Sequence, residues 1–408
     1  MKGLTVVLSI LLVLGVFQGL TRVKAEQKIE IRFSGWGAGS VELASYQKMF
    51  EEFEEEHPQY KVMYEPILEN YPQKIAMMFR SGTAPDVFYV DSSYAKYWIK
   101  TGYLLPIDKF LEEKSDFVPE LIKIFEHDEK LYGIPKDFSV LGMFYNKEMF
   151  KKANIEKPPE TWDELLVCAQ KLKEELGIVP LSLSRDLARW LAFIYQTGAE
   201  IVTPGHKESL FTDPKVVESL EFYTQFEKMG LAKMPGELGE AWNGDAFAKE
   251  KVAIIFEGNW LVPFLKDNFP QMYNKTGVAP LPRPENGKET TLAFVGGLAI
   301  YGGSEHPEAA WKLIDFLTSK EGQKKLVIQL GHTLPSRASL REDPELLPLH
   351  KELMLQYPYA RVWALGEISI DEIATIVNPE IEAAIKGIKT PKAACATMKR
   401  MTDEIIKG

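Results

Sequence analysis

Aromatic and acidic side chains beside predicted strand ends are the residues of this chain best suited to chemistry. An uninterrupted apolar run at 252–256 predicts a strand buried on both faces, and the turn that ends it carries Trp260. A later predicted strand contains Gly296 and Gly297, which weaken a strand unless something approaches its backbone closely. An aromatic ring beside an open backbone suits non-covalent binding of a flat polar ligand.

Signatures of catalysis and of metal binding are missing from the sequence. The six histidines are scattered, and none forms an HExxH pattern or a cluster with cysteine. There is no GxSxG, no P-loop and no strand-linked GxGxxG, because the glycines at 35–39 have the wrong spacing. We therefore expect no cofactor and no metal ion. Cys168 and Cys395 are expected to be small buried side chains, with a disulfide as the open alternative in an exported chain.

A cleaved export signal is predicted at residues 1–25. Met1 and Lys2 give a positive start, a mostly apolar stretch follows, and Val23-Lys24-Ala25 offers a cleavage site. An uncleaved anchor is the alternative, since the stretch is long for a signal and short for a spanning helix. No cysteine follows it directly, which argues against a lipid anchor. The expected location is periplasmic or otherwise extracytoplasmic.

Size and charge limit the classes of function. Removing 25 of the 408 residues leaves 383, enough for two domains. Three basic residues leave with the signal, so the net charge changes from −10 to −13. Such an acidic chain, without a basic stripe, is poorly suited to binding nucleic acid. The 8 Trp, 16 Tyr and 22 Phe exceed what a scaffold needs, so some are expected to take part in recognition.

Strands and helices alternate in the first third of the chain, which predicts an α/β unit. Strands are predicted at 29–33, 60–67 and 87–90, and Ser40 can cap a helix after the first of them. Ligands of open α/β sheets bind outside the carboxyl ends of strands. The loop at 34–40 and the turn at 91–94 are therefore candidate ligand contacts.

The section from about 140 to 285 is predicted to be mainly helical, as a second lobe. Thr161 and Glu164 form a capping box that opens a helix, and Asp213-Pro214 starts another that runs to Lys228. Alternate prolines at 278–284 force an extended backbone, as a strand crossing between lobes would need.

A set of short motifs extends over nearly the whole chain after the signal. Besides the block at 241–298, they are SGTAPDV (81–87), YGIP (132–135), FYNK (144–147), HPEAAW (306–311) and LPSR (334–337). In their order and spacing, these motifs strongly resemble the extracytoplasmic solute-binding proteins of ABC importers, in the branch that binds maltose-like sugars and oligosaccharides.

The resemblance implies a periplasmic-binding-protein-like α/β fold of two lobes, with a ligand cleft between them and three hinge crossovers near 135, 287 and 336. Lobe 1 would comprise 26–135 and 288–335, and lobe 2 would comprise 136–287 and 336–408. It also implies a receptor without enzymatic activity that is a monomer, traps a carbohydrate by hinge closure and presents the closed form to membrane permease subunits.

Sugar recognition needs aromatic rings for the apolar face of a pyranose and polar groups for its hydroxyls. Such side chains at strand ends and crossovers are the predicted ligand contacts. They are Trp36, Glu42, Asp91, Tyr94, Asp137, Trp242, Trp260, Arg337 and Trp363, and Gly297 is expected to offer a backbone contact.

Structural roles compete with binding at several of these positions. Asp91 can simply cap a helix, Gly297 can serve a tight strand crossing, and Arg337 can form a hinge salt bridge. Trp162 and Trp311 fall on predicted helices among apolar partners and are expected in the core. Trp98 and Trp190 stay open between the core and the site, with the core favoured.

Two other functions stay open on the sequence alone. An exported carbohydrate-active enzyme is possible because 58 acidic residues can supply a catalytic carboxylate pair. A receptor for a non-sugar solute, such as a peptide or polyamine, is the second alternative, since an amine can also stack on aromatic rings.

Overall fold

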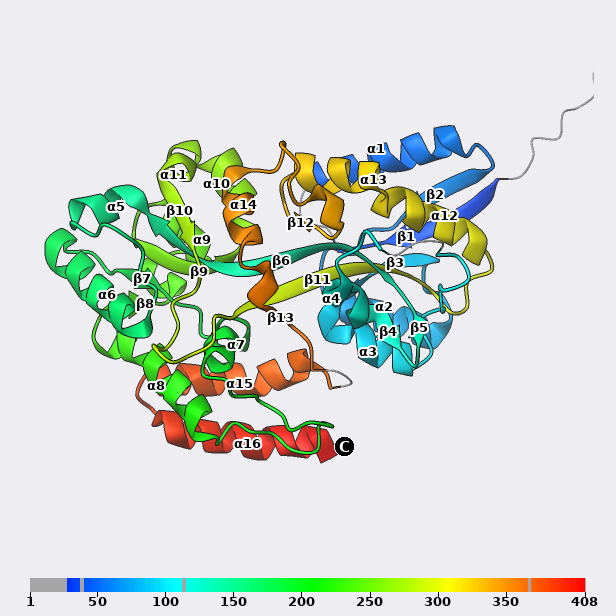
Figure 1. The fold of residues 1–408 in the computed structure, drawn as a ribbon. Helices are drawn as coiled ribbons and strands as arrows, with labels where there is room; N and C mark the ends of the chain where they lie inside the picture. The colour runs from blue at the N-terminus through cyan, green and yellow to red at the C-terminus, as the bar shows by residue number, and fades with distance from the viewer. Residues whose placement is uncertain (1–27, 37–39, 112–114, 366–367, 408) are drawn as a thin grey trace, which may run out of the picture.

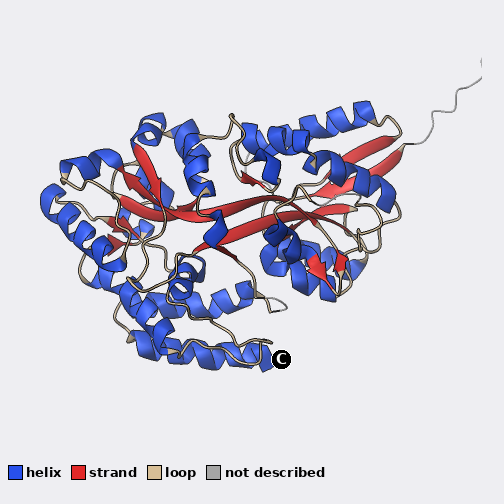
Figure 2. Ribbon diagram, in the orientation of Figure 1, coloured by secondary structure: helices blue, strands red, loops and turns tan. Residues whose placement is uncertain are grey.

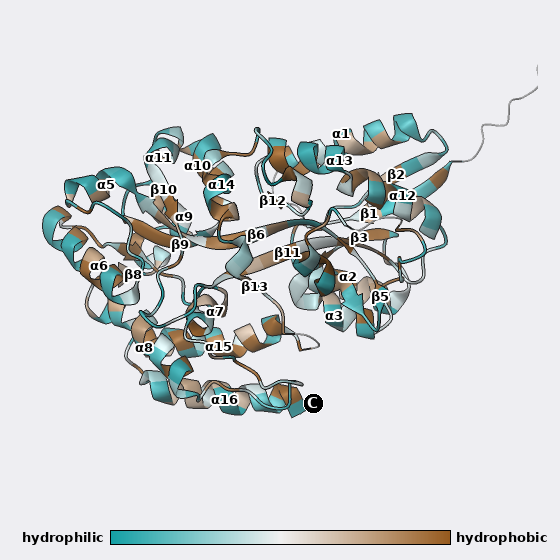
Figure 3. Cartoon of the chain, viewed as in Figure 1, coloured by the Kyte–Doolittle hydropathy of each residue, from teal (hydrophilic) through white to brown (hydrophobic). Residues whose placement is uncertain are grey.

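Two lobes flank one continuous sheet in the computed structural model (Figures 1 and 2). The structure describes residues 28–36, 40–111, 115–365 and 368–407, so the predicted signal at 1–25 lies outside the described residues. The sheet has 11 strands, eight of them in the order β2-β1-β3-β11-β6-β9-β7-β8. Hydrophobic residues concentrate along these strands, whereas the outer helices are mixed or hydrophilic (Figure 3).

The first lobe is built by the strand and helix alternation that the sequence predicts. Its parallel strands are β2 (Tyr60–Tyr64), β1 (Ile29–Ser34) and β3 (Val87–Asp91). The helices are α1 (Ser40–Glu56), α2 (Tyr71–Ser81), α3 (Ser92–Lys100), α4 (Pro119–Ile122), α12 (Pro307–Thr318) and α13 (Lys320–Gln323). A separate hairpin pairs β4 (Glu126–His127) with β5 (Lys130–Leu131). The carboxyl ends of β1 and β3 point toward the second lobe.

The second lobe is mainly helical, as predicted. Its short strands are β7 (Leu181–Ser182), β8 (Ala232–Lys233), β9 (Ile254–Gly258) and β10 (Thr276–Ala279). The helices are α5 (Lys147–Lys152), α6 (Trp162–Leu176), α7 (Leu187–Gln196), α8 (Pro214–Lys228), α9 (Asn243–Ala248), α10 (Leu261–Asn268), α11 (Pro270–Lys275), α15 (Ile370–Ile385) and α16 (Pro391–Lys407). The predicted capping box is confirmed, since the Thr161 side chain accepts from the Glu164 backbone N–H.

Two long antiparallel strands connect the lobes. β6 (Ile134–Asn146) pairs with β11 (Thr291–Ile300) over its first half and with β9 over its second half. The third connection starts at β12 (Leu334–Pro335), continues through α14 (Pro348–Met354) and reaches β13 (Ala360–Val362), which pairs with β11.

The prediction that 278–284 crosses between the lobes is wrong. The extended residues Thr276–Ala279 pair with the far end of β6, from Asn146 to Met143, inside the second lobe. Alternate prolines favour an extended backbone but do not say which strand it joins. The return crossing is made by β11 instead.

The cysteines and tryptophans that were expected to be structural lie in the core or pack against it. Cys168 and Cys395 are free and buried, which confirms the expectation of buried side chains. Trp162 and Trp190 are also buried, and Trp311 is partly buried against the first-lobe core. Within the described ranges, no helix has the length and apolarity needed to cross a membrane.

A buried histidine on the third connection should make stability fall in mild acid. His350 on α14 is fully buried, its Nε2 lies 3.4 Å from the Asn259 carbonyl oxygen, and its Nδ1 has no partner. Its pKa is lowered to about 4, mainly by burial and to a smaller extent by the nearby His332 and Lys266. Between pH 6.5 and 4 the unfolded chain takes up a proton that the folded chain excludes, so stability is present above pH 6.5 and is lost as the pH falls.

We expect the free energy of unfolding to drop by about 2 kcal/mol between pH 7 and pH 5 on account of this one group. Urea melts at the two pH values measure it. The drop should shrink in His350→Gln and persist in His206→Asn, which removes a histidine from a surface loop. Equal pH dependence in both variants would assign the effect to other groups.

Candidate ligand-binding cleft

A cleft of about 740 Å³ lies between the lobes, next to the carboxyl ends of β1 and β3. Its walls come from both lobes and from the connecting strands β6 and β11. A smaller cavity of about 330 Å³, which we call the aromatic chamber, shares Trp36, Asp91 and Phe294 with the cleft. Both volumes are typical of small-molecule sites.

Seven of the ten predicted contacts line these two cavities. Those that line the cleft are Trp36, Glu42, Asp91, Asp137 and Trp260, and the aromatic chamber adds Tyr94 and Trp363. They come from five separate stretches of the chain and from both lobes. The expectation that strand ends and crossovers meet at one place therefore agrees with the geometry, while ligand contact itself stays a prediction.

Gly297 is not among the residues that line the two cavities, and its predicted backbone contact with a ligand stays a prediction. A Cβ atom built on it would come within 2.3 Å of the Phe125 ring in the first-lobe core. Its neighbour Gly296 lines the cleft instead, and a Cβ there would come within 2.9 Å of Asp137 Oδ1. The β6–β11 register shifts between these two glycines, so strand alternation alone could not assign their sides.

Arg337 is held outside the cleft, in the structural role that was the alternative for it. Its Nη1 donates to Asp116 Oδ2 at 3.1 Å and its Nε donates to the Thr318 carbonyl oxygen at 2.7 Å. The guanidinium also lies over the Phe117 ring, 4.2 Å from its centroid. With these partners, Arg337 braces the start of the third connection and is not available to a ligand.

Trp242 supports the cleft wall without lining it. It precedes α9, and its ring packs edge to face against Phe264 at a centroid distance of 5.0 Å. Phe264 is the residue that lines the cleft. The structure therefore gives Trp242 a packing role.

Trp260 is fixed in place by a buried carboxylate. Its Nε1 donates to Glu257 Oε2 at 3.0 Å, and the same oxygen accepts from Arg189 Nη2 at 2.7 Å. The other oxygen, Oε1, accepts from Asn243 Nδ2 at 3.0 Å. The indole lies close over Gly258, where a Cβ would clash at 2.2 Å. A half-buried ring locked in this way is preorganised for stacking.

The cleft floor carries a charge pair that is already balanced. The Lys136 ammonium contacts the Asp137 carboxylate, and Thr333 Oγ1 donates to Asp137 Oδ2 at 3.1 Å. Although burial alone lowers the pKa of Lys136, Asp137 and Glu42 raise it above its usual range. The ammonium also lies 4.5 Å from the centroid of the Tyr89 ring. Lys136 is therefore a charged partner of the protein itself, with little capacity left for an anionic ligand.

Asp91 does two things at the end of β3. Its Oδ1 accepts from the Ser93 backbone N–H at 2.8 Å and so caps α3, which is the structural role that was the alternative to ligand binding. It also lines both cavities. Burial raises the pKa of Asp91 to about 6, and the nearby carboxylates of Asp371 and Asp137 contribute to the increase.

Several lining residues were missed by sequence reasoning. Phe294 precedes the two glycines in β11 and lies 5.7 Å from Trp260 and 5.9 Å from Trp363 between ring centroids. Lys136 follows the YGIP motif directly, so its position beside Asp137 was available as a signal. Asp371 comes from the first turn of α15, and nothing local in the sequence connects it with Asp91. Trp98 is 2% exposed, as expected for the core, yet it also contributes to the chamber wall.

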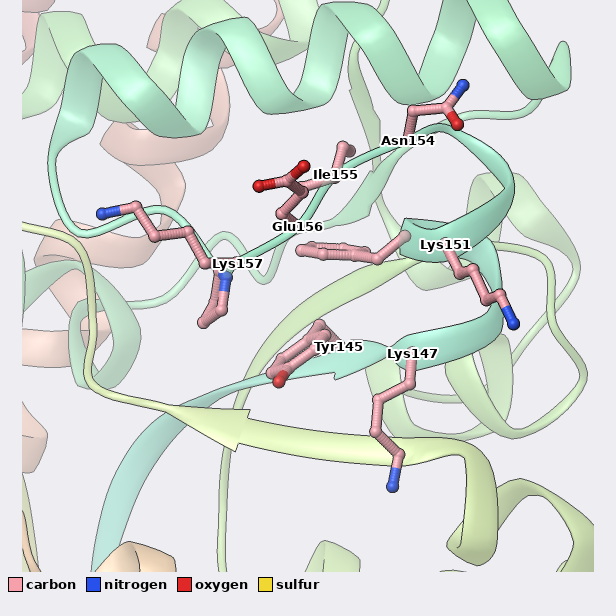
Figure 4. Close-up of a pocket in the computed structure, with 9 residues that line it drawn as sticks. Tyr145, Lys147, Lys151, Asn154, Ile155, Glu156 and Lys157 are labelled. Atoms are coloured by element: carbon pink, nitrogen blue, oxygen red, sulfur yellow. The ribbon is translucent and has the colours of Figure 1, made fainter.

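A separate hollow of about 580 Å³ on the second lobe lies at α5 (Figure 4). Its floor is the ring pair of Tyr145 and Phe150, at 4.7 Å between centroids. Lys147, Lys151 and Lys157 surround it, but Figure 4 shows their side chains diverging from one another. Because these cations do not converge on a common point, the interlobe cleft is the better candidate for a specific site.

A comparison with known protein families identifies the family of this chain. A family model described as bacterial extracellular solute-binding protein matches residues 37–324. The chain belongs to the bacterial extracellular solute-binding proteins. This family consists of binding proteins that do not catalyse a reaction, in agreement with the receptor predicted from the sequence. Among the described residues, no group of three or more His, Cys, Asp or Glu side chains could hold a metal ion.

Relatives and solved structures are similar over most of this solute-binding protein. The multiple sugar-binding protein of Streptococcus mutans is 25% identical over 345 residues, which cover 79% of each protein. An uncharacterized ABC transporter extracellular-binding protein of Pyrococcus horikoshii is 27% identical over 319 residues, which cover 75% of this chain and 72% of that protein.

The solved structures bear on the fold. The GacH receptor of Streptomyces glaucescens superposes with a TM-score of 0.83 at 23% identity, over 94% of this chain and 99% of that one. The sugar-binding protein MalE of Xanthomonas citri gives 0.83 at 22% identity, over 93% and 97%. The predicted two-lobe α/β fold is confirmed.

Proposed function

We propose that this solute-binding protein is the exported receptor of an ABC importer and that it binds a neutral-faced ring ligand, a mono- or oligosaccharide, in the interlobe cleft. The observation that carries the proposal is that the locked Trp260 ring lines the same cavity as the carboxylates of Glu42, Asp91 and Asp137. An aromatic plate together with hydroxyl acceptors matches the two faces of a pyranose. Membership of the family and the similarity to a multiple sugar-binding protein support the same ligand class.

The size and shape of the cavities favour a ligand longer than one ring. The aromatic chamber adjoins a further hollow of about 790 Å³, and the two share Pro72, Tyr94, Trp98 and Asp371. Three adjoining cavities, each with aromatic side chains in its lining, therefore follow one another from the cleft outward. An oligosaccharide can place successive rings along such a series of cavities.

Trapping follows from the three connections between the lobes. We propose that β6, β11 and the segment from 334 to 360 bend as hinges. Lobe 1 (26–135 and 288–335) and lobe 2 (136–287 and 336–408) then each move as a unit. The ligand would shift the equilibrium toward the closed form by its extra affinity for that form. The closed outer surfaces would then contact the permease subunits.

Export is part of the proposal. The predicted signal at 1–25 would deliver the mature protein outside the cytoplasm. N-terminal sequencing of the native protein should start at Glu26, whereas an intact Met1 on membrane-bound protein would show an uncleaved anchor.

A thermal-shift panel tests the ligand class. Neutral mono- and oligosaccharides should include at least one ligand that stabilises the mature protein, by about 2.7 kcal/mol at 100 times its Kd. Amino acids, peptides and polyamines in the same panel represent the non-sugar alternative. If the protein releases shorter sugars from the oligosaccharides of the panel, it is a carbohydrate-active enzyme. Stabilisation by peptides alone would overturn the saccharide assignment.

A further inference from the structure

The aromatic chamber differs from the rest of the cleft in its balance of charge. Its walls hold the rings of Trp36, Tyr94 and Trp363, which come from both lobes, in a cavity of about 330 Å³. Tyr94 stacks on Trp98 with ring planes 16° apart and centroids 5.4 Å apart. The face of an aromatic ring is the negative part of its quadrupole, so a cation that reaches a ring face in this cavity is attracted to it.

Two carboxylates enter this chamber, one from each lobe. Asp91 ends β3 in the first lobe, and Asp371 lies in the first turn of α15 in the second lobe. The Oδ2 atom of Asp371 is buried and has no hydrogen-bond partner, while the Tyr94 hydroxyl donates to the Asp371 carboxylate. The Oδ1 atom of Asp91 accepts from the Ser93 backbone N–H, and the Ser93 hydroxyl is a second hydrogen-bond partner of this carboxylate. The two carboxylates repel each other, which contributes to the raised pKa of Asp91 after the larger effect of burial.

No cation of the protein neutralises the chamber from within its lining. None of the described residues that line it is Lys, Arg or His, and the undescribed stretches 37–39 and 366–367 contain no basic residue in the sequence. The neighbouring carboxylates are different, because Asp137 is paired with Lys136 and Glu257 with Arg189. Arg80 and Lys100 line the adjoining hollow but not the chamber.

We propose that the aromatic chamber binds a positively charged ammonium group of the ligand, held between Asp91 and Asp371 and against the faces of the surrounding rings. The inference rests on the proposed function, since it assigns one end of the cleft ligand an amine. A neutral ligand leaves two carboxylates facing each other as the lobes close, whereas an ammonium group attracts both and so favours closure. Aromatic faces add cation–π attraction. The ammonium belongs either to an amino sugar or to a small organic amine.

A matched pair of probes isolates the charge. Choline and 3,3-dimethylbutan-1-ol have nearly the same shape, and only choline is charged. Their binding to the full mature protein at pH 7 can be followed by tryptophan fluorescence, because three tryptophans line the chamber. We expect choline to bind at least about tenfold more tightly, the size of a cation–π contact strengthened by a carboxylate. Glucosamine against glucose, in a second arm, shows whether an amino sugar is the source.

Substitutions of Asp91 and Asp371 test whether the preference for choline over its neutral analogue depends on these two carboxylates. Asp371→Asn and Asp91→Asn should each reduce the preference for choline to below about threefold, and asparagine preserves the cap of α3. Glu174→Gln makes the same change in net charge on the exposed face of α6 and should leave the preference unchanged. Circular dichroism melts show that the variants are folded.

The outcomes separate this inference from the saccharide assignment. Equal affinity for the two probes, or a preference that survives in both asparagine variants, would overturn the ammonium site. If neutral oligosaccharides still stabilise the protein in that case, the proposed function stands without it. A choline preference without any saccharide binding would instead support the ammonium site and reject the sugar.

Discussion

Replacing Trp260 by alanine should remove most of the affinity for the cleft ligand while the protein stays folded. The indole is half-buried and faces the cleft, so its loss takes away the apolar platform of a stacked ring. We expect Kd to rise roughly 5- to 150-fold, equivalent to about 1–3 kcal/mol. Calorimetric titration with the best saccharide gives the affinity, and a denaturant melt gives the stability of the same variant.

Two further substitutions show whether a change in Kd comes from lost stacking on the ligand or from lost stability. Trp260→Phe keeps a ring but loses the hydrogen bond to Glu257, so a smaller loss of affinity is expected. Trp311→Ala removes a partly buried tryptophan that stacks on Phe110 away from the cleft, and it should lower stability without changing Kd. Unchanged affinity beside a large loss of stability in Trp260→Ala would place this ring in the core.

Glu257→Ala should destabilise the protein by about 3–5 kcal/mol, because Glu257 is the buried carboxylate that holds the cleft residue Trp260. The carboxylate is 1% exposed and accepts from Arg189, Trp260 and Asn243. Although burial alone lowers the pKa of Arg189, Glu257 raises it, so the guanidinium stays charged. Removing the carboxylate takes the acceptor from the Trp260 indole N–H and leaves the Arg189 guanidinium with the more distant Asp186 carboxylate at 3.7 Å. Asn243 Nδ2 keeps its hydrogen bond to Ser184 Oγ. Urea unfolding at pH 7 measures the loss.

The double variant Arg189→Met with Glu257→Leu is the control for a charge effect. It removes both charges and keeps apolar volume, and we expect it to be more stable than Glu257→Ala alone. A loss below about 1 kcal/mol in Glu257→Ala would mean that the Arg189 charge is compensated elsewhere.

Local patterns in the sequence predicted most of the fold because local interactions form it. The alternation at 29–33 became β1, and the capping box at Thr161 and Glu164 became the start of α6. Strand ends predicted much of the cleft wall, since parallel strands present their carboxyl ends at the same edge. Trp36 and Asp91 lie together for this reason.

The errors came from contacts between distant segments and from one irregularity in the sheet. Arg337 meets Asp116 because the backbone at Phe117 pairs with Arg337 across more than 200 residues, which no short motif records. Asp371 faces Asp91 through the packing of two lobes. Gly297 was predicted at the cleft, but Gly296 is the glycine that lines it. A register shift between the two breaks the simple alternation of sides along the strand.

Closure of the two lobes around a saccharide is the central claim, and solution scattering tests it most directly. The radius of gyration of the mature protein should be measured without ligand and with the best saccharide from the panel at saturation. We expect a smaller radius in the bound state, because the lobes approach each other by bending at β6, β11 and the segment 334–360. The Trp260→Ala variant should need a higher saccharide concentration for the same decrease. An unchanged radius at proven saturation would contradict trapping by closure and would leave a rigid binding cleft.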